Sequence, residues 1–221
     1  MGWRRSPVRG TGSARLAHRF ARVPLLVVVA ASVCLAATPK AFAFGSAAPC
    51  TSRDTSAAFA RWLDPAQYFL ASNGGFENGA ADWNLNAGAA VAAGNEPYQL
   101  AGASDANHLS LPAGSSAESR TACVEMGEAT VRLLVDVPNV AGATLTVDAS
   151  VVNPTTGLTL ETRYVVVSGL TPAGWTPTPE IVVANLLGGI LPENLTLRIT
   201  AGGAPATWGV DDVYVDPFKH R

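Results

Sequence analysis

Short segments in which apolar and polar residues alternate recur along most of this chain. Between Leu195 and Thr200, leucine or isoleucine occupies every second position, and the segment from Thr144 to Val151 alternates in the same way. A period of two places one set of side chains on a core and the other on solvent, which is the pattern of a half-buried β-strand. The segment from Val131 to Val137 is mostly apolar, as expected of a strand inside a sheet.

Turn-forming residues separate these segments at intervals of roughly 8 to 12 residues, which is typical of an all-β sandwich or barrel. The stretch from Asn153 to Gly157 contains a proline and ends in glycine, so it is the expected loop of a hairpin. The pattern therefore predicts an antiparallel jelly-roll β-sandwich. The other strands expected are Tyr68–Ala71, Trp83–Asn86, Ala89–Ala92, Tyr98–Ala101, Leu109–Leu111, Ala117–Val124, Leu158–Val167, Ile181–Ala184 and Trp208–Val215.

One segment before the strands favours a helix, between Thr51 and Pro65. Asp54 is a suitable N-terminal cap, alanines follow it, and the closing proline prevents the helix from continuing. Phe59, Trp62 and Leu63 would lie on one face at helical spacing and pack on the sheet. We therefore expect one short accessory helix before the sandwich.

The amino terminus has the three parts of a secretory signal peptide. Six arginines precede an apolar run from Val23 to Ala37, and the small-residue site Ala41-Phe42-Ala43 follows it. This arrangement predicts cleavage after Ala43 and a secreted, extracellular product. The alternative is a membrane anchor, although the apolar run is shorter than the about twenty residues that a spanning helix needs.

Cleavage would leave an N-terminal lead with the helix over residues 44–69 and a β-sandwich domain over residues 70–217. Seven of the fifteen basic residues, and no acidic one, lie in residues 1–43, so the remainder carries eight basic and seventeen acidic residues, a formal net charge of −9. An acidic surface disfavours nucleic acid and anionic lipid as partners. We expect no membrane span in the mature chain.

Two cysteines remain after the expected cleavage, Cys50 and Cys123. An even pair in a secreted protein most simply forms one disulfide, and this one would tie the lead to a strand in the middle of the chain. The alternative is two unpaired thiols.

A glycine-rich turn near the start of the sandwich carries one carboxylate. The stretch Asn73–Gly79 contains three glycines with Glu77 among them, and Trp83 follows shortly after. Near the other end, Asp211 and Asp212 are adjacent in the last expected strand, where a regular pleat would point them to opposite faces. Because Val210 and Val213 are three residues apart rather than two, a β-bulge there would let both aspartates reach the core edge.

A carboxylate at the edge of a core needs a counter-charge, and few basic residues remain in the mature chain. Calcium binds six to eight oxygens, including the backbone carbonyls that a glycine turn offers. We therefore expect Glu77 and Asp211 to meet around a structural calcium ion. The alternative is that both carboxylates only accept hydrogen bonds from turn amides.

Four short motifs resemble carbohydrate-binding modules of the family 4/9 type, within the galactose-binding-like jelly rolls. They are Asn73–Glu77, Trp83–Gly88, Gly174-Trp175 and Val210–Val213. In that group, the resemblance implies, the glutamate of the first motif and the first aspartate of the last strand hold a structural calcium. These positions are Glu77 and Asp211 here.

The resemblance also implies a sugar-binding face lined by aromatic rings. Candidate stacking residues are Tyr98, Tyr164 and Trp175, since flat rings bind the apolar faces of sugars; the alternative for each is a place in the core. The chain departs from the family pattern because residues 112–120 contain no aromatic side chain and no catalytic domain accompanies the module. Polysaccharide or cell-wall glycan is the partner expected.

Motifs of catalysis are lacking. His108 and His220 are the histidines left after cleavage, and no Gly-x-Ser-x-Gly, His-Glu-x-x-His or phosphate-binding loop occurs. A pair of carboxylates acting on a glycoside stays open, since such residues have no fixed spacing. We expect a non-catalytic protein with no catalytic residues.

A second resemblance leads to another function. Trp62–Pro65 and Tyr214–Pro217 are similar to segments of an uncharacterised group of exported actinobacterial proteins. The apolar, glycine-containing loop Leu186–Leu191 either folds over the core or forms an exposed contact patch. In the second case the protein would be a structural or adhesive component of the cell envelope that binds no sugar.

Overall fold

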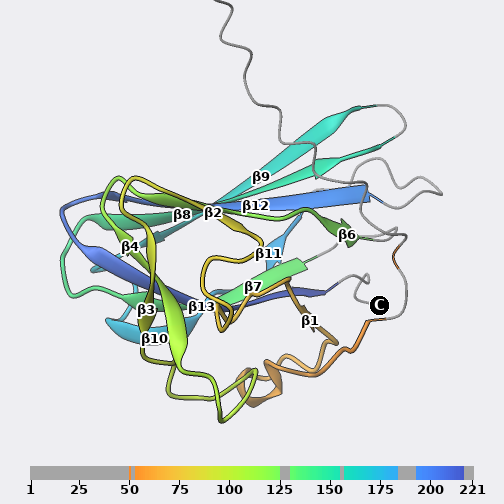
Figure 1. The fold of residues 1–221 in the computed structure, drawn as a ribbon. Helices are drawn as coiled ribbons and strands as arrows, with labels where there is room; N and C mark the ends of the chain where they lie inside the picture. Colours follow the sequence, from red (N-terminus) through yellow and green to blue (C-terminus); the bar gives the residue numbers. More distant parts are fainter. Residues whose placement is uncertain (1–49, 51–52, 125–129, 155–156, 184–192, 217–221) are drawn as a thin grey trace, which may run out of the picture. The chain divides into compact units, whose positions relative to one another are not determined.

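Thirteen β-strands make up nearly all the regular structure of the described residues. The computed structural model describes residue 50 and residues 53–124, 130–154, 157–183 and 193–216. The predicted leader and the Leu186–Leu191 loop lie outside these residues. The strands, all but β5 labelled in Figure 1, are β1 (Phe69–Leu70), β2 (Trp83–Asn86), β3 (Ala90–Ala93), β4 (Asn107–Pro112), β5 (Ser116–Ser119), β6 (Ala122–Val124), β7 (Thr130–Val137), β8 (Ala143–Val152), β9 (Thr159–Val167), β10 (Gly174–Pro177), β11 (Ile181–Val182), β12 (Glu193–Gly203) and β13 (Thr207–Asp216).

The strands form two antiparallel sheets. A seven-stranded sheet has the order β10-β7-β13-β4-β3, with β1 also paired to β13 and β11 to β7. A six-stranded sheet has the order β2-β5-β12-β8-β9, with β6 also paired to β12. The predicted all-β antiparallel sandwich is therefore confirmed, and strands distant in sequence, such as β4 and β13, lie side by side.

Alternation decides which side chains fill the core between the sheets. In β8, Leu145, Val147, Ala149 and Val151 are all buried, while the residues between them are half-buried. The same alternation in β12 buries its leucines and isoleucine. In β7, seven of the eight residues are buried, which agrees with a strand covered on both faces.

The last strand contains the predicted β-bulge. The pairing of β13 with β7 shifts register between Asp211 and Tyr214, and Asp212 has a φ of 50°. The extra residue keeps Val210 and Val213 in the core and leaves Asp211 and Asp212 each 1% exposed. The bulge is therefore what places two adjacent carboxylates inside the molecule.

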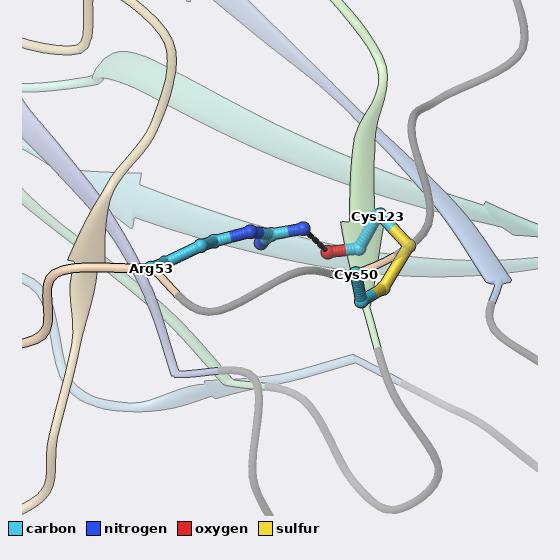
Figure 2. The surroundings of a disulfide bond; sticks show 3 residues. All are labelled: Cys50, Arg53 and Cys123. Atoms are coloured by element: carbon cyan, nitrogen blue, oxygen red, sulfur yellow. Dashed lines mark hydrogen bonds between the residues drawn. A yellow bond between two sulfur atoms is a disulfide. The ribbon is translucent and has the colours of Figure 1, made fainter.

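The disulfide between Cys50 and Cys123 is also confirmed, with the two Cα atoms 5.4 Å apart. It ties the start of the described chain to β6. Figure 2 shows that the guanidinium of Arg53 donates a hydrogen bond to the carbonyl of Cys123. The same guanidinium lies 4.0 Å from the centre of the Phe69 ring.

The predicted helix over Thr51–Pro65 is wrong. Its one helical part among the described residues is the 3₁₀ turn η1, Ala60–Trp62, which ends at Leu63 with a φ of 63°. Leu63 is 94% exposed rather than packed on the sheet. The lead instead bridges Ser56 to Tyr68, and Phe59 packs edge-on against the rings of Tyr68 and Tyr214. Tertiary contacts of the aromatic residues thus override the helix propensity of the alanines.

The strand predicted over Tyr98–Ala101 is wrong as well, because this segment is a loop. The carboxylate of Glu96 accepts hydrogen bonds from the backbone amides of Tyr98 and Leu100, the latter at 2.6 Å. Amides taken by a side chain do not join a strand ladder. No helix in the described part of the chain is long and apolar enough to cross a membrane.

Candidate functional site

A polar groove lies on the outer face of the six-stranded sheet. Its volume is about 430 Å³. The residues that line it come from four neighbouring strands and are charged or carry a hydroxyl group: Glu118, Asp148, Ser150, Glu161, Arg163, Thr196 and Arg198. They are the outward-facing members of strands whose alternate residues fill the core, so the alternation that builds the sandwich also builds this lining.

The charges in the groove alternate in sign across the sheet. The strand register places Glu118 opposite Arg198, Arg198 opposite Asp148, and Asp148 opposite Arg163. Asp148 accepts hydrogen bonds from Nε of Arg163 at 2.6 Å and from Nη2 at 3.3 Å. The groove therefore offers a row of carboxylate acceptors and guanidinium donors, with hydroxyl groups beside it.

Tyr164 belongs to the strand that borders this groove but lies on its other side. It is half-buried and packs against the core, opposite Val147 in the register. Burial raises the pKa of its hydroxyl. Its predicted role in stacking on a sugar stays a prediction.

Tyr98 and Trp175 lie together, away from the groove. The hydroxyl of Tyr98 donates a 3.0 Å hydrogen bond to the backbone carbonyl of Trp175, in edge strand β10 of the seven-stranded sheet. The ring of Tyr98 packs edge-on against Trp62, with the centroids 5.0 Å apart, and the guanidinium of Arg61 lies 4.7 Å from the Tyr98 ring centre. The ring of His108 meets Trp175 at 5.8 Å. Two of the three predicted stacking residues are thus joined in one half-buried aromatic patch.

A buried acidic cluster lies at the bulge of β13. Both carboxylate oxygens of Asp212 and one of Asp211 lack a hydrogen-bond partner of ordinary geometry. Asp105 is close by: a Cβ on Gly75 would lie 3.4 Å from Oδ1 of Asp212 and 3.9 Å from Oδ2 of Asp105. The carboxylate of Glu96, 2% exposed, also acts on both aspartates of the bulge.

Burial and mutual repulsion make these groups hard to ionise. Burial, and then the charge of Asp212, raise the pKa of Asp211 to about 8. Burial, and then the charge of Glu96, raise the pKa of Asp212 to about 7. Burial together with Glu77 and Glu96 raises the pKa of Asp105. Such a cluster needs either protons or a bound cation.

Arg132 is the one buried cation among the described residues, but it does not neutralise the acidic cluster. Its Nη1 lies 2.6 Å from Oδ2 of Asp64, and its Nε donates a 3.0 Å hydrogen bond to the carbonyl of Thr178. The ring of Phe59 covers the guanidinium at 4.4 Å. Arg132 therefore fastens the lead to β7 rather than neutralising the bulge.

The structure places Glu77 at the rim of the acidic cluster. Its Oε1 accepts hydrogen bonds from the backbone amides of Ala106 and Asn107, both at 2.9 Å, and its Oε2 accepts one from the side chain of Asn107 at 3.2 Å. Its charge reaches Asp105, whose charge acts in turn on Asp212. Glu77 and the bulge of Asp211 thus border the same cluster, and the shared calcium stays a prediction.

Glycine is required where the turn approaches the bulge. A Cβ on Gly74 would lie 2.7 Å from the carbonyl oxygen of Val213. The amide of Val213 donates a 3.1 Å hydrogen bond to the carbonyl of Gly74. The indole of Trp83 closes the turn by donating hydrogen bonds to the carbonyls of Ser72 and Asn73. The turn and the last strand therefore meet in space, as the sequence predicts.

Several residues of these sites have no signal in the sequence. Glu96 and Asp105 lie in a loop, part of which the sequence pattern wrongly predicts to be a strand. The groove residues are spread over four strands, and each looks like an ordinary solvated position of a half-buried strand. Only the register that pairs these strands brings the groove residues together.

The fold is similar to several solved structures, carbohydrate-binding modules among them. The module TmCBM61, solved with beta-1,4-galactotriose, shares 17% identity over 68% of this chain and 98% of that chain, with a TM-score of 0.43. The xylan-binding module CBM15 shares 15% identity over 71% and 99%, with a TM-score of 0.45. The enzymatically active domain of bacteriophage CBA120 tailspike protein 4 shares 13% identity over 67% and 21%, with a TM-score of 0.46.

Likenesses of this size carry no argument about what this chain binds. No protein-family model and no curated protein matches the sequence. The resemblance to the family 4/9 type therefore stays a prediction.

Proposed function

We propose that this protein is a secreted, non-catalytic module that binds glycan in the groove of the six-stranded sheet. The observation that supports this proposal is the groove itself, a hollow of about 430 Å³ lined only by charged and hydroxyl side chains. Cross-strand charge pairs alone would stabilise a flat sheet surface by a fraction of a kcal/mol each and require no hollow.

A glycan fits the chemistry of this groove. Sugar hydroxyls both donate and accept hydrogen bonds, so one hydroxyl donates to a carboxylate such as Glu118 while its neighbour accepts from Arg198. Hydrogen bonds to charged groups are the stronger ones, contributing about 1.5–3 kcal/mol each. With no aromatic ring in the lining, recognition here rests on hydrogen bonds rather than on stacking.

The same lining supports a binding role over a catalytic one. Asp148 already accepts two hydrogen bonds from Arg163, so its oxygens are occupied by a neighbouring side chain. A glycosidase needs one carboxyl group that is protonated and another that is free to attack or to activate water. We accordingly expect the glycan to leave the groove unchanged.

Affinity electrophoresis through gels that contain soluble polysaccharides tests the proposal. We expect retardation by at least one neutral polysaccharide, and an affinity about tenfold or more lower in Arg198→Gln, because a charged hydrogen bond is lost. Val165→Thr is the matched control, since this residue is 42% exposed on the same face but outside the groove lining. No retardation of the wild-type chain on any polysaccharide would refute the function, and release of reducing sugar would refute its non-catalytic character.

The proposal includes a structural calcium ion at the acidic cluster. Calcium prefers carboxylate oxygens, and the cluster supplies unpartnered ones on Asp211 and Asp212 with Asp105 and Glu96 nearby. In the described part of the chain, no three acidic, histidine or cysteine side chains form a ready-made coordination sphere. The ion would therefore draw the carboxylates together and offset their repulsion. Glu77 would bind at the rim or hold the loop that carries Asp105.

A further inference from the structure

Strand β9 offers the longest unpaired sheet edge in the described part of the chain. The strand order places it at the end of the six-stranded sheet, where it pairs with β8 on one side (Figure 1). It spans nine residues, whereas the edge strands β2, β3 and β10 span four each. A long edge presents a row of backbone amides and carbonyls that another chain can pair with, unless the edge is blocked.

Most of the features that block an edge strand are lacking in β9. The strand contains no proline and no lysine, and its register against β8 runs without a shift from Thr159 to Val167. Its two charged residues, Glu161 and Arg163, are exposed on the outer face rather than pointing into the core. The edge is therefore regular enough to accept a further strand.

The core covers the inner face of β9 incompletely. Leu160, Thr162 and Tyr164 face inward, yet each is only half-buried. The residues opposite them in β8 are all buried. A strand added beside β9 would cover these inward-facing side chains, and removing apolar surface from water favours such an addition.

One pairing of β9 with a second copy of itself brings opposite charges together. In an antiparallel pair with a two-fold axis at Thr162, each Glu161 lies opposite Arg163 of the other copy. On the inner face, Leu160 then lies opposite Tyr164. Opposite charges directly across two strands are favourable, and like charges are unfavourable. Moving the axis by one residue in either direction places Glu161 or Arg163 opposite itself, so charge selects the first register.

We propose that β9 pairs antiparallel with β9 of a second copy of this chain, which joins two six-stranded sheets into one across a two-fold axis at Thr162. Arg163 keeps its contact with Asp148 and gains Glu161 of the second copy, and in the described part of the chain Glu161 forms no ion pair of its own. Such an interface is self-complementary, as two-fold symmetry requires. Because Glu161 and Arg163 also line the polar groove, the grooves of the two copies would lie next to each other.

Sedimentation velocity of the purified chain at physiological ionic strength, over a concentration series from micromolar to submillimolar, tests this proposal. We expect an equilibrium between monomer and dimer. Glu161→Arg and Arg163→Glu should each weaken dimerisation about tenfold or more, because each variant places two pairs of like charges across the β9–β9 interface. An equimolar mixture of the two variants should restore the dimer, since the arginines of one then face the glutamates of the other.

Restoration on mixing separates strand pairing from folding, because a misfolded variant would not regain a dimer when a second variant is added. Asp54→Arg makes the same change of charge at an exposed position of the lead, and it should leave the equilibrium unchanged. A wild-type chain that stays monomeric throughout the series would overturn the proposal. Single variants that dimerise like the wild type, or a mixture that stays monomeric, would overturn it as well. No sugar is present in this experiment, so the proposed function stands or falls separately.

Discussion

Asp64 contributes to stability through a buried ion pair, and its effect depends on pH. Burial on its own raises the pKa of Asp64, but hydrogen bonds from Arg132 and Tyr68 outweigh it, so the pKa lies below its ordinary value of 3.8. A carboxylate with a lowered pKa stabilises the fold above pH 3.8, and this contribution is lost as the pH falls through the folded value.

Asp64→Asn should therefore destabilise the protein by about 3–5 kcal/mol at pH 7, because Arg132 is left buried without a counter-charge. Urea unfolding of both proteins across pH 7 to pH 2 measures the effect. The difference should shrink toward zero in acid, where the wild-type carboxyl group is also protonated. Arg120→Gln, which breaks an exposed pair with Asp82, should change little. A pH-independent difference for Asp64→Asn would contradict the assignment.

At the residue scale, the proposed calcium site depends most on Asp212. A ligand present at 100 times its dissociation constant stabilises a fold by about 2.7 kcal/mol, which is roughly 5–10 °C in melting temperature for a domain of this size. We expect calcium to raise the melting temperature of the wild-type chain by this order relative to chelator. The shift should be strongly reduced in Asp212→Asn and reduced in Glu77→Gln.

Glu161→Gln is the control for these variants, because it removes the same charge from an exposed position on the other sheet. Scanning calorimetry with calcium and with chelator gives the comparison. Identical melting temperatures in both conditions would contradict a structural calcium. An unchanged calcium shift in Asp212→Asn would move the site away from the bulge.

The attachment of the N-terminal lead to the sandwich depends most on a covalent bond, the disulfide. The disulfide joins residues that are 73 positions apart, and closing a loop of this length stabilises a fold by about 4 kcal/mol in the chain-entropy model. Cys123→Ser should lower stability by about this amount and speed proteolysis of the segment around η1. Limited proteolysis with and without reductant, followed by mass spectrometry, measures the second effect. Cleavage of the lead at the same rate in both states would contradict the role of the bridge.

At the same scale, the sequence predicts elements well where spacing alone decides them. The three-residue gap between Val210 and Val213 indicates the bulge, and the even cysteine count indicates the bridge. Prediction fails where side chains distant in sequence decide. The lead is not a helix because Phe59 packs on Tyr68 and Tyr214. The segment after Glu96 is not a strand because a carboxylate takes its amides.

At the scale of the whole molecule, the fold class follows from the period-two pattern, but the surfaces do not. The alternation specifies which residue of each strand faces outward. It does not specify which strands become neighbours. Arg198 lies between Glu118 and Asp148 only because β12 pairs with both β5 and β8. The groove therefore had no sequence signal, whereas the turn and the bulge that border the acidic cluster had one.

Backbone nuclear magnetic resonance of the ¹⁵N-labelled chain, titrated with a neutral hexasaccharide such as xylohexaose, tests the central claim most directly. If the groove binds glycan, the largest shift changes should fall on amides around Glu118, Asp148 and Arg198, and they should saturate with increasing sugar. Spectra that stay unchanged with every neutral and amino sugar tried, or that change only outside the groove, would contradict glycan binding by the six-stranded sheet.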